Sequence, residues 1–202
     1  MSSRAAFLLV GAVLSAAVFL ASQAFQTGPT GVFMREAYAA PSDVQNGRKL
    51  LSTGDSFRGR KDWEKARNAY VEALKSFQAG NAQKLIVATN AIIALCNTMP
   101  DLNLTKMKDG SYQGSETGYV AEVSVEVTVK GGKISAMRIV STRENRALKS
   151  LQTVPQQIVS RKTPSVDAFS GATITSYAVM NATAKALKQA QPPAKEDAKV
   201  GG

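Results

Sequence analysis

The sequence of 202 residues contains no histidine and a single cysteine, Cys96. The absence of histidine excludes histidine-ligated zinc and haem, and every catalytic pair in which histidine activates a serine or a cysteine. One cysteine cannot form an intrachain disulfide, a cysteine-ligated zinc site or a four-cysteine iron–sulfur cluster. Any redox chemistry of this chain therefore requires an organic cofactor.

Acidic residues are also few, because 15 Asp and Glu stand against 25 Lys and Arg and give a net charge of +10. The excess is even, with net +4 over residues 42–100 and net +5 over residues 101–190. A nucleic-acid-binding surface would gather basic and aromatic residues on one element. We therefore expect no nucleic-acid partner. The charge is that of a solubilised basic surface, or it attracts an acidic partner or anionic lipid head groups.

The first 39 residues are predicted to be an export or anchor segment. No charged residue occurs from Ala5 to Ala24, and a helix of this length would span a hydrocarbon core of roughly 30 Å. Ala37-Tyr38-Ala39 fits the small-x-small pattern of signal-peptide cleavage, and Ser22-Gln23-Ala24 is a second candidate. The sequence favours a cleaved signal peptide over an uncleaved N-terminal anchor. Either interpretation places the remaining chain in the periplasm or on the outer face of the cytoplasmic membrane.

Residues 42–100 are predicted to form a helical module. Apolar residues recur at helical spacing in Lys61–Phe77 and again in Asn81–Asn97, and a preceding helix is expected at Gly47–Arg58. The segment resembles a tetratricopeptide repeat, whose small and aromatic positions are occupied by Gly54, Phe57, Trp63, Ala66, Tyr70 and Ala73. The alternative is an ordinary three-helix bundle. Cys96 lies on an apolar helix and is expected to be a core residue.

An antiparallel hairpin is predicted in the next part of the chain. Asp109–Gly114 begins with a turn pair and a short strand, and residues 121–129 alternate between apolar and polar side chains. Gly131-Gly132 has the composition of a two-residue hairpin turn, so residues 133–141 are expected to return as the partner strand.

The register of this hairpin raises a question about one arginine. Counted from the turn, Val129 faces Ile134 and Val127 faces Ala136, so Arg138 would lie on the apolar face. Either a β-bulge shifts the register, which the sequence favours, or Arg138 meets a buried anion.

Two further helices are predicted before a disordered tail at residues 191–202. Ser150–Ser160 is expected to be a short helix that is interrupted near Pro155. A longer helix is expected at about Thr175–Gln189, with Ala178, Ala182 and Ala186 along one stripe.

The segment Asp167–Ser176, at the start of the longer helix, is the candidate site for an anion. Backbone N–H groups at a helix start and the positive end of the helix dipole favour a phosphate. Gly171 and Ala172 leave the backbone accessible, and hydroxyl groups are available on Ser170, Thr173 and Thr175. Taken alone, the string Ser-Gly-Ala-Thr is also typical of an ordinary N-capped helix. It is not a Walker loop, because the GKS/T ending is absent.

The order of motifs resembles a known family. The chain contains Asp109-Gly110-x-Tyr112-x-Gly114, a Val-rich strand, Gly-Gly-Lys-Ile at 131–134 and Asp167-x-x-Ser170-Gly171-Ala172-Thr173-x-x-Ser176. Together these resemble the small FMN-binding domain of periplasmic flavoproteins and of the flavin-carrying subunits of sodium-pumping NADH:quinone reductases. The resemblance covers about residues 108–190. One departure is that a Glu-Thr-containing segment of the family is replaced here by Ser141-Thr142-Arg143-Glu144-Asn145.

The resemblance implies the cofactor and how it is held. In the family, FMN is joined through its phosphate to the threonine of the motif, which is Thr173 here, while some members hold FMN without the bond. A dedicated flavin transferase makes the link from FAD with a divalent metal and releases AMP. Its recognition sequence here would be Asp167, Ser170, Gly171 and Ala172. Since the chain has no histidine to activate a threonine hydroxyl, an external enzyme suits these residues.

The sequence therefore predicts an α+β protein with a helical module at 42–100 and an FMN-binding domain at 106–190. Its expected role is extracytoplasmic electron transfer, with a flavin transferase and an unidentified redox protein as partners and an association with the membrane. The alternatives are an interaction protein without flavin and a reductase with its own substrate. No catalytic acid or base and no metal site are predicted; the basic side chains expected to adjust the flavin potential are Lys162, Arg161 and Arg138. The predicted cofactor-binding residues are Asp167, Ser170, Gly171, Ala172, Thr173, Thr175 and Ser176.

Overall fold

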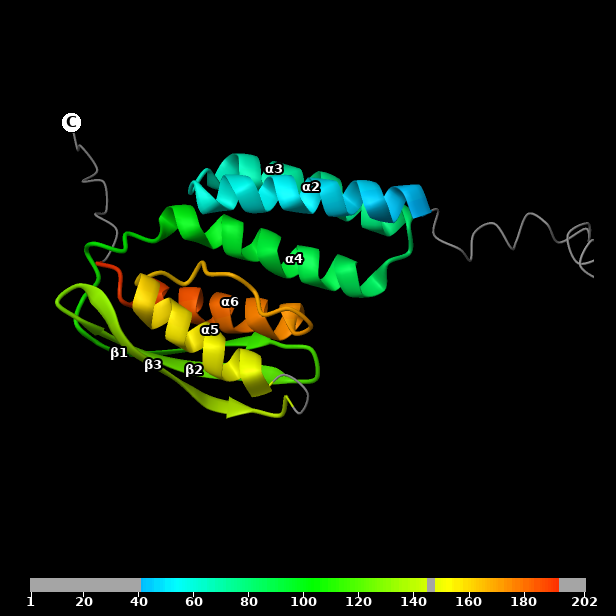
Figure 1. Cartoon of the computed structure of the whole chain (residues 1–202). Coiled ribbons are helices and arrows are strands. Elements are labelled where there is room, and N and C mark those ends of the chain that lie inside the picture. The colour runs from blue at the N-terminus through cyan, green and yellow to red at the C-terminus, as the bar shows by residue number, and fades with distance from the viewer. Residues whose placement is uncertain (1–40, 145–147, 193–202) are drawn as a thin grey trace, which may run out of the picture. The chain divides into compact units, whose positions relative to one another are not determined.

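The structure, a computed structural model, describes residues 41–144 and 148–192. The export or anchor segment and the tail beyond Pro192 therefore lie outside the described residues. Within the described residues, no helix is long and apolar enough to cross a membrane. The elements, labelled in Figure 1, follow in chain order: helices α2 (Pro41–Gly59), α3 (Trp63–Ala79) and α4 (Gln83–Thr98), the 3-10 helix η1 (Met99–Asp101), strands β1 (Gly110–Thr117), β2 (Glu122–Lys130) and β3 (Lys133–Thr142), and helices α5 (Leu148–Arg161) and α6 (Thr173–Gln189). The predicted α+β class is confirmed.

Helices α2 and α3 pack side by side because glycines on one meet aromatic rings on the other (Figure 1). A Cβ atom on Gly47 would lie 2.5 Å from a ring carbon of Phe77, and one on Gly54 would overlap the ring of Tyr70. Only a residue without a side chain allows this approach. The N-cap residue of α3 is Asp62, whose side chain accepts a hydrogen bond from the backbone N–H of Lys65.

The three strands form an antiparallel sheet in the order β1-β2-β3. Gly131 and Gly132 have φ angles of 60° and 67°, so both adopt the left-handed conformation of a tight hairpin turn. The predicted pairing of Val129 with Ile134 is confirmed.

The predicted β-bulge is also confirmed. The register shifts between Val129 and Thr128, so that Val127 faces Met137 and not Ala136 as the simple count predicts. The shift turns Arg138 to the polar face, where it pairs with Glu126 at 2.8 Å. Because Glu126 balances the charge of Arg138 on this face, the arginine does not require the buried anion that was the alternative.

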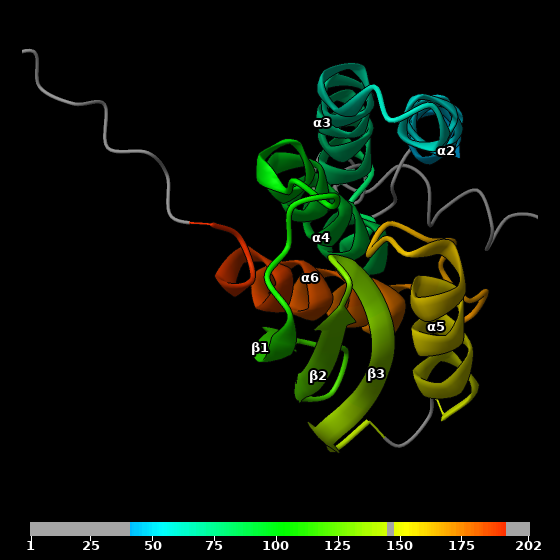
Figure 2. The same ribbon diagram turned by 90° about the vertical axis from the view of Figure 1, so that its left-hand side faces the viewer.

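Helix α6 lies between the sheet and the N-terminal helices (Figure 2). On the sheet side, a Cβ on Gly114 would overlap the carbonyl oxygen of Ala182, so the backbones of β1 and α6 are in direct contact. On the other side, Asn181 donates a hydrogen bond of 2.8 Å to the carbonyl of Ala91 in α4. The helical segment, which consists of α2, α3 and α4, therefore shares one core with the sheet. This core includes Ala66, Tyr70, Ile92, Leu95, Val123, Val125, Val127, Ile134, Ala178, Met180, Ala182 and Leu187.

Two helix predictions need correction. Helix α5 runs without interruption from Leu148 to Arg161 and contains Pro155, because Val154 and Ile158 on either side are both buried and hold one helical face on the core. Helix α6 begins at Thr173, two residues earlier than predicted. Thr173 is consequently the first residue of the helix and not part of the preceding loop.

Candidate functional site

A tight turn leads into α6. The backbone N–H of Ala172 donates to the carbonyl of Phe169 at 3.0 Å, and Gly171 between them has a φ angle of 82°. A positive φ at the third position of a turn is typical of glycine. Ser176, which is buried, holds the turn from inside the helix: its hydroxyl donates to the Ala172 carbonyl at 2.8 Å and accepts from the N–H of Phe169 at 3.0 Å.

Helix α6 begins without a side-chain cap. Its N-cap residue is Ala172, and no acidic residue lies in its first turn. Within the described part of the chain, the backbone N–H groups of Thr173, Ile174 and Thr175 have no hydrogen-bond acceptor. Helix α3, by contrast, is capped by Asp62. The start of α6 therefore offers three N–H donors to an anion.

These donors lie at a cavity of about 340 Å³. Its walls come from three parts of the chain: the start of α6, the first two turns of α4, and the loop and strand end that carry Tyr119 and Glu144. The lining residues are Lys84, Leu85, Ala88, Tyr119, Glu144, Gly171, Ala172, Thr173, Ile174 and Thr175. The cavity thus combines backbone N–H donors with apolar side chains and with Tyr119, a residue that is 49% exposed.

Glu144 organises one wall of this cavity. Only 5% of the residue is exposed. One carboxylate oxygen accepts from the N–H groups of Val120 at 2.8 Å and Ala121 at 3.4 Å, and the other accepts from the Thr175 hydroxyl at 3.1 Å. A Cβ on Gly118 would overlap this carboxylate, so glycine is needed for the loop to approach it. Glu144 therefore joins the loop at 118–121 to the first turn of α6.

The structure separates the seven predicted site residues into two groups. Gly171, Ala172, Thr173 and Thr175 line the cavity. The half-buried Thr173 is the one whose hydroxyl has no hydrogen-bond partner within the described residues, whereas the Thr175 hydroxyl is buried and donates to Glu144.

The other three predicted residues do not line this cavity. Ser176 supports the turn from within, and Ser170 is exposed at its tip. Asp167 is exposed, accepts from Arg161 at 2.9 Å and lies 4.0 Å from Arg58. It lines a different cavity.

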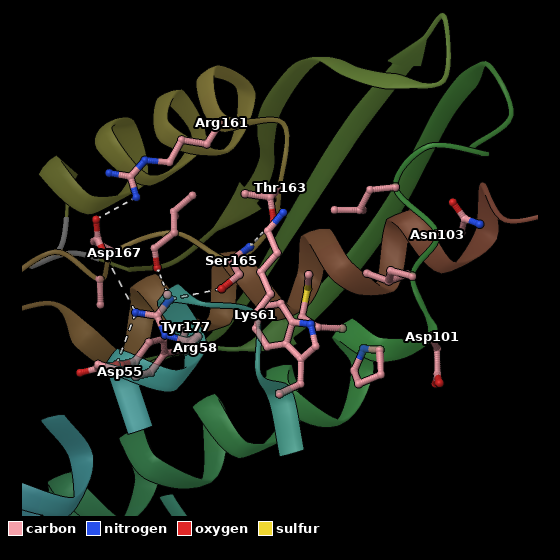
Figure 3. Close-up of a pocket in the computed structure, with 18 residues that line it drawn as sticks. Asp55, Arg58, Lys61, Asp101, Asn103, Arg161, Thr163, Ser165, Asp167 and Tyr177 are labelled. Atoms are coloured by element: carbon pink, nitrogen blue, oxygen red, sulfur yellow. Dashed lines mark hydrogen bonds and ion pairs between the residues drawn. The ribbon is translucent and has the colours of Figure 1, made fainter. Parts of the chain in front are cut away.

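That second cavity, of about 880 Å³, lies where the ends of α2 and α5 approach the loop before α6 (Figure 3). Figure 3 shows the Arg58 side chain, 10% exposed, reaching from α2 to that loop. It donates to the Val166 carbonyl at 2.9 Å and the Ser165 hydroxyl at 3.2 Å, and its Nε donates to the Tyr70 hydroxyl at 3.2 Å. Tyr177 also lines the cavity, and burial raises its pKa to about 12, so its hydroxyl stays neutral. Arg58 thus ties the helical segment to the chain that enters α6.

The three basic side chains expected to act on a flavin, Arg138, Arg161 and Lys162, are not among the residues that line the cavity at Thr173. Arg138 pairs with Glu126 on the polar face of the sheet, and Arg161 pairs with Asp167. Within residues 41–144 and 148–192, the cation that lines the cavity at Thr173 is Lys84 of α4. Sequence reasoning missed Lys84, Leu85 and Ala88 because they belong to a helix nearly ninety positions before Thr173. It also missed Tyr119, for which the Gly118-Tyr119 bend was the available signal.

Comparison with known proteins supports the predicted resemblance. Residues 118–188 match the family of FMN-binding domains. The chain is 36% identical over 89 residues to an uncharacterised protein of Treponema pallidum (strain Nichols), which is 43% of this chain and 25% of that protein. It is 30% identical over 84 residues to the NADH:acrylate oxidoreductase of Vibrio harveyi, 41% of this chain and 8% of that protein. The chain therefore spans a quarter or less of each relative. Helix α4 lies before the matched residues.

Proposed function

We propose, on the premise that residues 118–188 are an FMN-binding domain, that this protein carries FMN in the cavity at the start of α6 and transfers electrons outside the cytoplasm. The observation that carries the proposal is the match of the FMN-binding domain to the segment that holds the uncapped helix start and the Thr173 hydroxyl. FMN supplies the redox chemistry when bound, and the protein supplies its position and electrostatic environment.

The residues around the cavity fit this cofactor. Pockets for small molecules typically measure roughly 300–1,000 Å³, and this one measures about 340 Å³. The N–H groups of Thr173, Ile174 and Thr175, which have no acceptor among the described residues, suit a phosphate. Leu85 and Tyr119 offer an apolar and an aromatic surface to a flat ring. Each of these groups lines the same cavity, so one molecule with a phosphate and a planar ring can use them together.

The proposal includes a covalent link at Thr173. Its hydroxyl lines the cavity and has no partner within the described residues, so it needs to break no hydrogen bond before it reacts. The hydroxyl oxygen forms an ester bond to the FMN phosphorus of FAD while the pyrophosphate bond breaks. AMP leaves, and the hydroxyl proton passes to a base of the flavin transferase, which also holds the divalent metal. The exposed Ser170 and Asp167, beside the acceptor in sequence, are accessible to such an enzyme.

The same proposal assigns roles to the flanking segments. The N-terminal segment would direct export, as a cleaved signal peptide or as an anchor, to the periplasm or to the outer face of the cytoplasmic membrane. The helical segment α2–α4 would act as a tetratricopeptide-like module through which a redox protein docks. The ester would keep the cofactor from diffusing away after export.

In-gel flavin fluorescence after full denaturation tests the proposal. The full chain is co-expressed with a flavin transferase as wild type, Thr173→Ala, Thr173→Ser and Thr117→Ala; Thr117 is an exposed threonine of β1 that does not line the cavity. We expect fluorescent bands for wild type and Thr117→Ala and none for Thr173→Ala. The serine variant keeps a hydroxyl and should retain some label.

Other outcomes would contradict parts of the proposal. A yellow native protein with a dark denatured band would show FMN bound without the ester, which overturns the link at Thr173 but not the cofactor. A protein that is colourless in both states would overturn the flavin function and favour an interaction protein built on the helical segment. A fluorescent Thr173→Ala band would place the ester on another residue.

A further inference from the structure

We propose that the N-terminal helical segment supplies part of the flavin site, with Leu85 and Ala88 of α4 as one wall and Lys84 as the cation that balances the cofactor's negative charge. This inference rests on the function proposed above and adds residues that lie outside the matched domain. It makes α4 a component of the redox centre and not merely a docking element.

The lining of the cavity includes residues of both α4 and α6. Lys84, Leu85 and Ala88 line it together with Gly171 to Thr175. Residues three and four positions apart lie on one face of a helix, so Lys84, Leu85 and Ala88 present a single face to the start of α6. Without α4, that side of the cavity would be open to solvent.

Helix α4 is held beside α6 by a hydrogen bond and by shared core packing. The side chain of Asn181 in α6 donates to the Ala91 carbonyl at 2.8 Å. Ala88, which lines the cavity, and Ile92, one turn further along α4, are both buried in the shared core. Lys84 lies one helical turn before Ala88, so its Cα position relative to Thr173 follows from the packing of α4 on α6 (Figure 1).

The charge of Lys84 also favours an anion in the cavity. Among the described residues, Lys84 and Glu144 are the charged ones that line the cavity. The Glu144 carboxylate is occupied by the N–H of Val120 and the hydroxyl of Thr175. Within the described residues, Lys84 has no carboxylate partner. Its charge is therefore available to a phosphodiester and opposes the build-up of negative charge when the cofactor is reduced.

The start of α4 adds to the same field. Like α6, α4 has an alanine as its N-cap, Ala82, without a side-chain hydrogen bond, and no acidic residue lies in its first turn. Lys84 and Leu85 are the second and third residues of α4, and Thr173 is the first of α6. The positive ends of two helix dipoles thus border one cavity, which lowers the free energy of an anion there.

A tryptophan placed in the α4 wall tests the contact directly. A tryptophan that touches a flavin quenches its fluorescence, so Leu85→Trp is compared with Asn90→Trp, an exposed position of α4 outside the cavity. Both variants are flavinylated by co-expression with the transferase and measured as native proteins. We expect Leu85→Trp to lose at least half of the wild-type fluorescence per flavin and Asn90→Trp to retain it. After denaturation the two should be equally bright.

Redox titration of the same flavinylated protein tests Lys84. The midpoint potential should fall from wild type to Lys84→Gln and fall further in Lys84→Glu, because reduction then adds negative charge without a nearby cation. The shift should shrink as the salt concentration rises. Lys49→Gln, an exposed lysine of α2 that does not line the cavity, should leave the potential unchanged.

The outcomes separate this inference from the function on which it rests. A flavinylated wild type with an unquenched Leu85→Trp variant and an unchanged potential in Lys84→Glu would overturn the role of α4 while the flavin function stands. A wild type that takes up no flavin would overturn both. Quenching by Leu85→Trp with an unchanged potential in Lys84→Glu would overturn the role of Lys84 alone.

Discussion

Replacing Glu144 should weaken both the fold and the site, because this buried carboxylate holds the loop at 118–121 against α6. Its two shorter hydrogen bonds, to the Val120 N–H at 2.8 Å and the Thr175 hydroxyl at 3.1 Å, are lost in Glu144→Ala. A hydrogen bond to a charged group contributes about 1.5–3 kcal/mol. Relief from burying the charge offsets part of the loss. We expect Glu144→Ala to lower the free energy of unfolding by about 3 kcal/mol.

Glu144→Gln is the matched variant. A glutamine retains one carbonyl oxygen for the Val120 N–H, and the Thr175 hydroxyl can accept a hydrogen bond from the new amide. The expected loss is only about 1 kcal/mol.

Urea denaturation and thermal unfolding measure both variants. About 3 kcal/mol corresponds to a fall in melting temperature of roughly 6–12 °C for a unit of this size. Hydrogen exchange at the Val120 amide should accelerate in Glu144→Ala. The reasoning is refuted if the free energy of unfolding of Glu144→Ala lies within about 0.5 kcal/mol of the wild-type value. It is also refuted if Glu144→Gln is destabilised as much as Glu144→Ala.

Three further predictions concern the fold around the site. Gly114→Ala should lower the free energy of unfolding, measured by urea denaturation, by about 1–3 kcal/mol, because the new Cβ would meet the backbone of α6, including the Ala186 nitrogen at 2.8 Å. The control is Gly59→Ala, which should not lower the free energy of unfolding, because a Cβ there meets no atom within 4 Å. The N–H groups of Gly131 and Gly132 lower the pKa of Asp109, so its contribution to stability is full above pH 3.8 and is lost as the pH falls through the lowered value. Asp109→Asn should therefore flatten the acid limb of a stability–pH curve, and an unchanged limb would contradict this. Burial raises the pKa of the Cys96 thiol to about 11, so iodoacetamide at pH 8 should alkylate it only after unfolding, as mass spectrometry can show; rapid reaction of the native protein would contradict its core position.

Local patterns were sufficient to predict most of the secondary structure. The alternation at residues 121–129 and the glycine pair at 131–132 predicted β2 and the turn, since side-chain period and turn conformation are local properties. The bulge was predicted because a charged residue, Arg138, fell on the apolar face in the simple register. Pro155 was misread because the proline's local preference was overcome by the burial of its neighbours in the core.

The candidate site was predictable only in part. The segment from Gly171 to Thr175 was predictable, because small and hydroxyl residues at the start of a helix are typical of an anion site. Thr173, and not Thr175, presents to the cavity a hydroxyl that has no partner in the described part of the chain, because the Thr175 hydroxyl donates to Glu144, 31 positions away in the sequence.

By itself, the sequence indicated the class of cofactor, because a chain without histidine and with one cysteine lacks common ligands of redox metals, and its motif at 167–176 resembles that of FMN-binding domains. It also indicated the α+β class and the glycine turn, because these follow from local periodicity and turn composition, whereas the simple register count was correct for Val129 with Ile134 but not for Val127. Only the tertiary structure decided what surrounds the site. Lys84, Leu85 and Ala88 reach Thr173 because α4 packs on α6 through the shared core, and contacts between residues so far apart in the chain leave no local pattern.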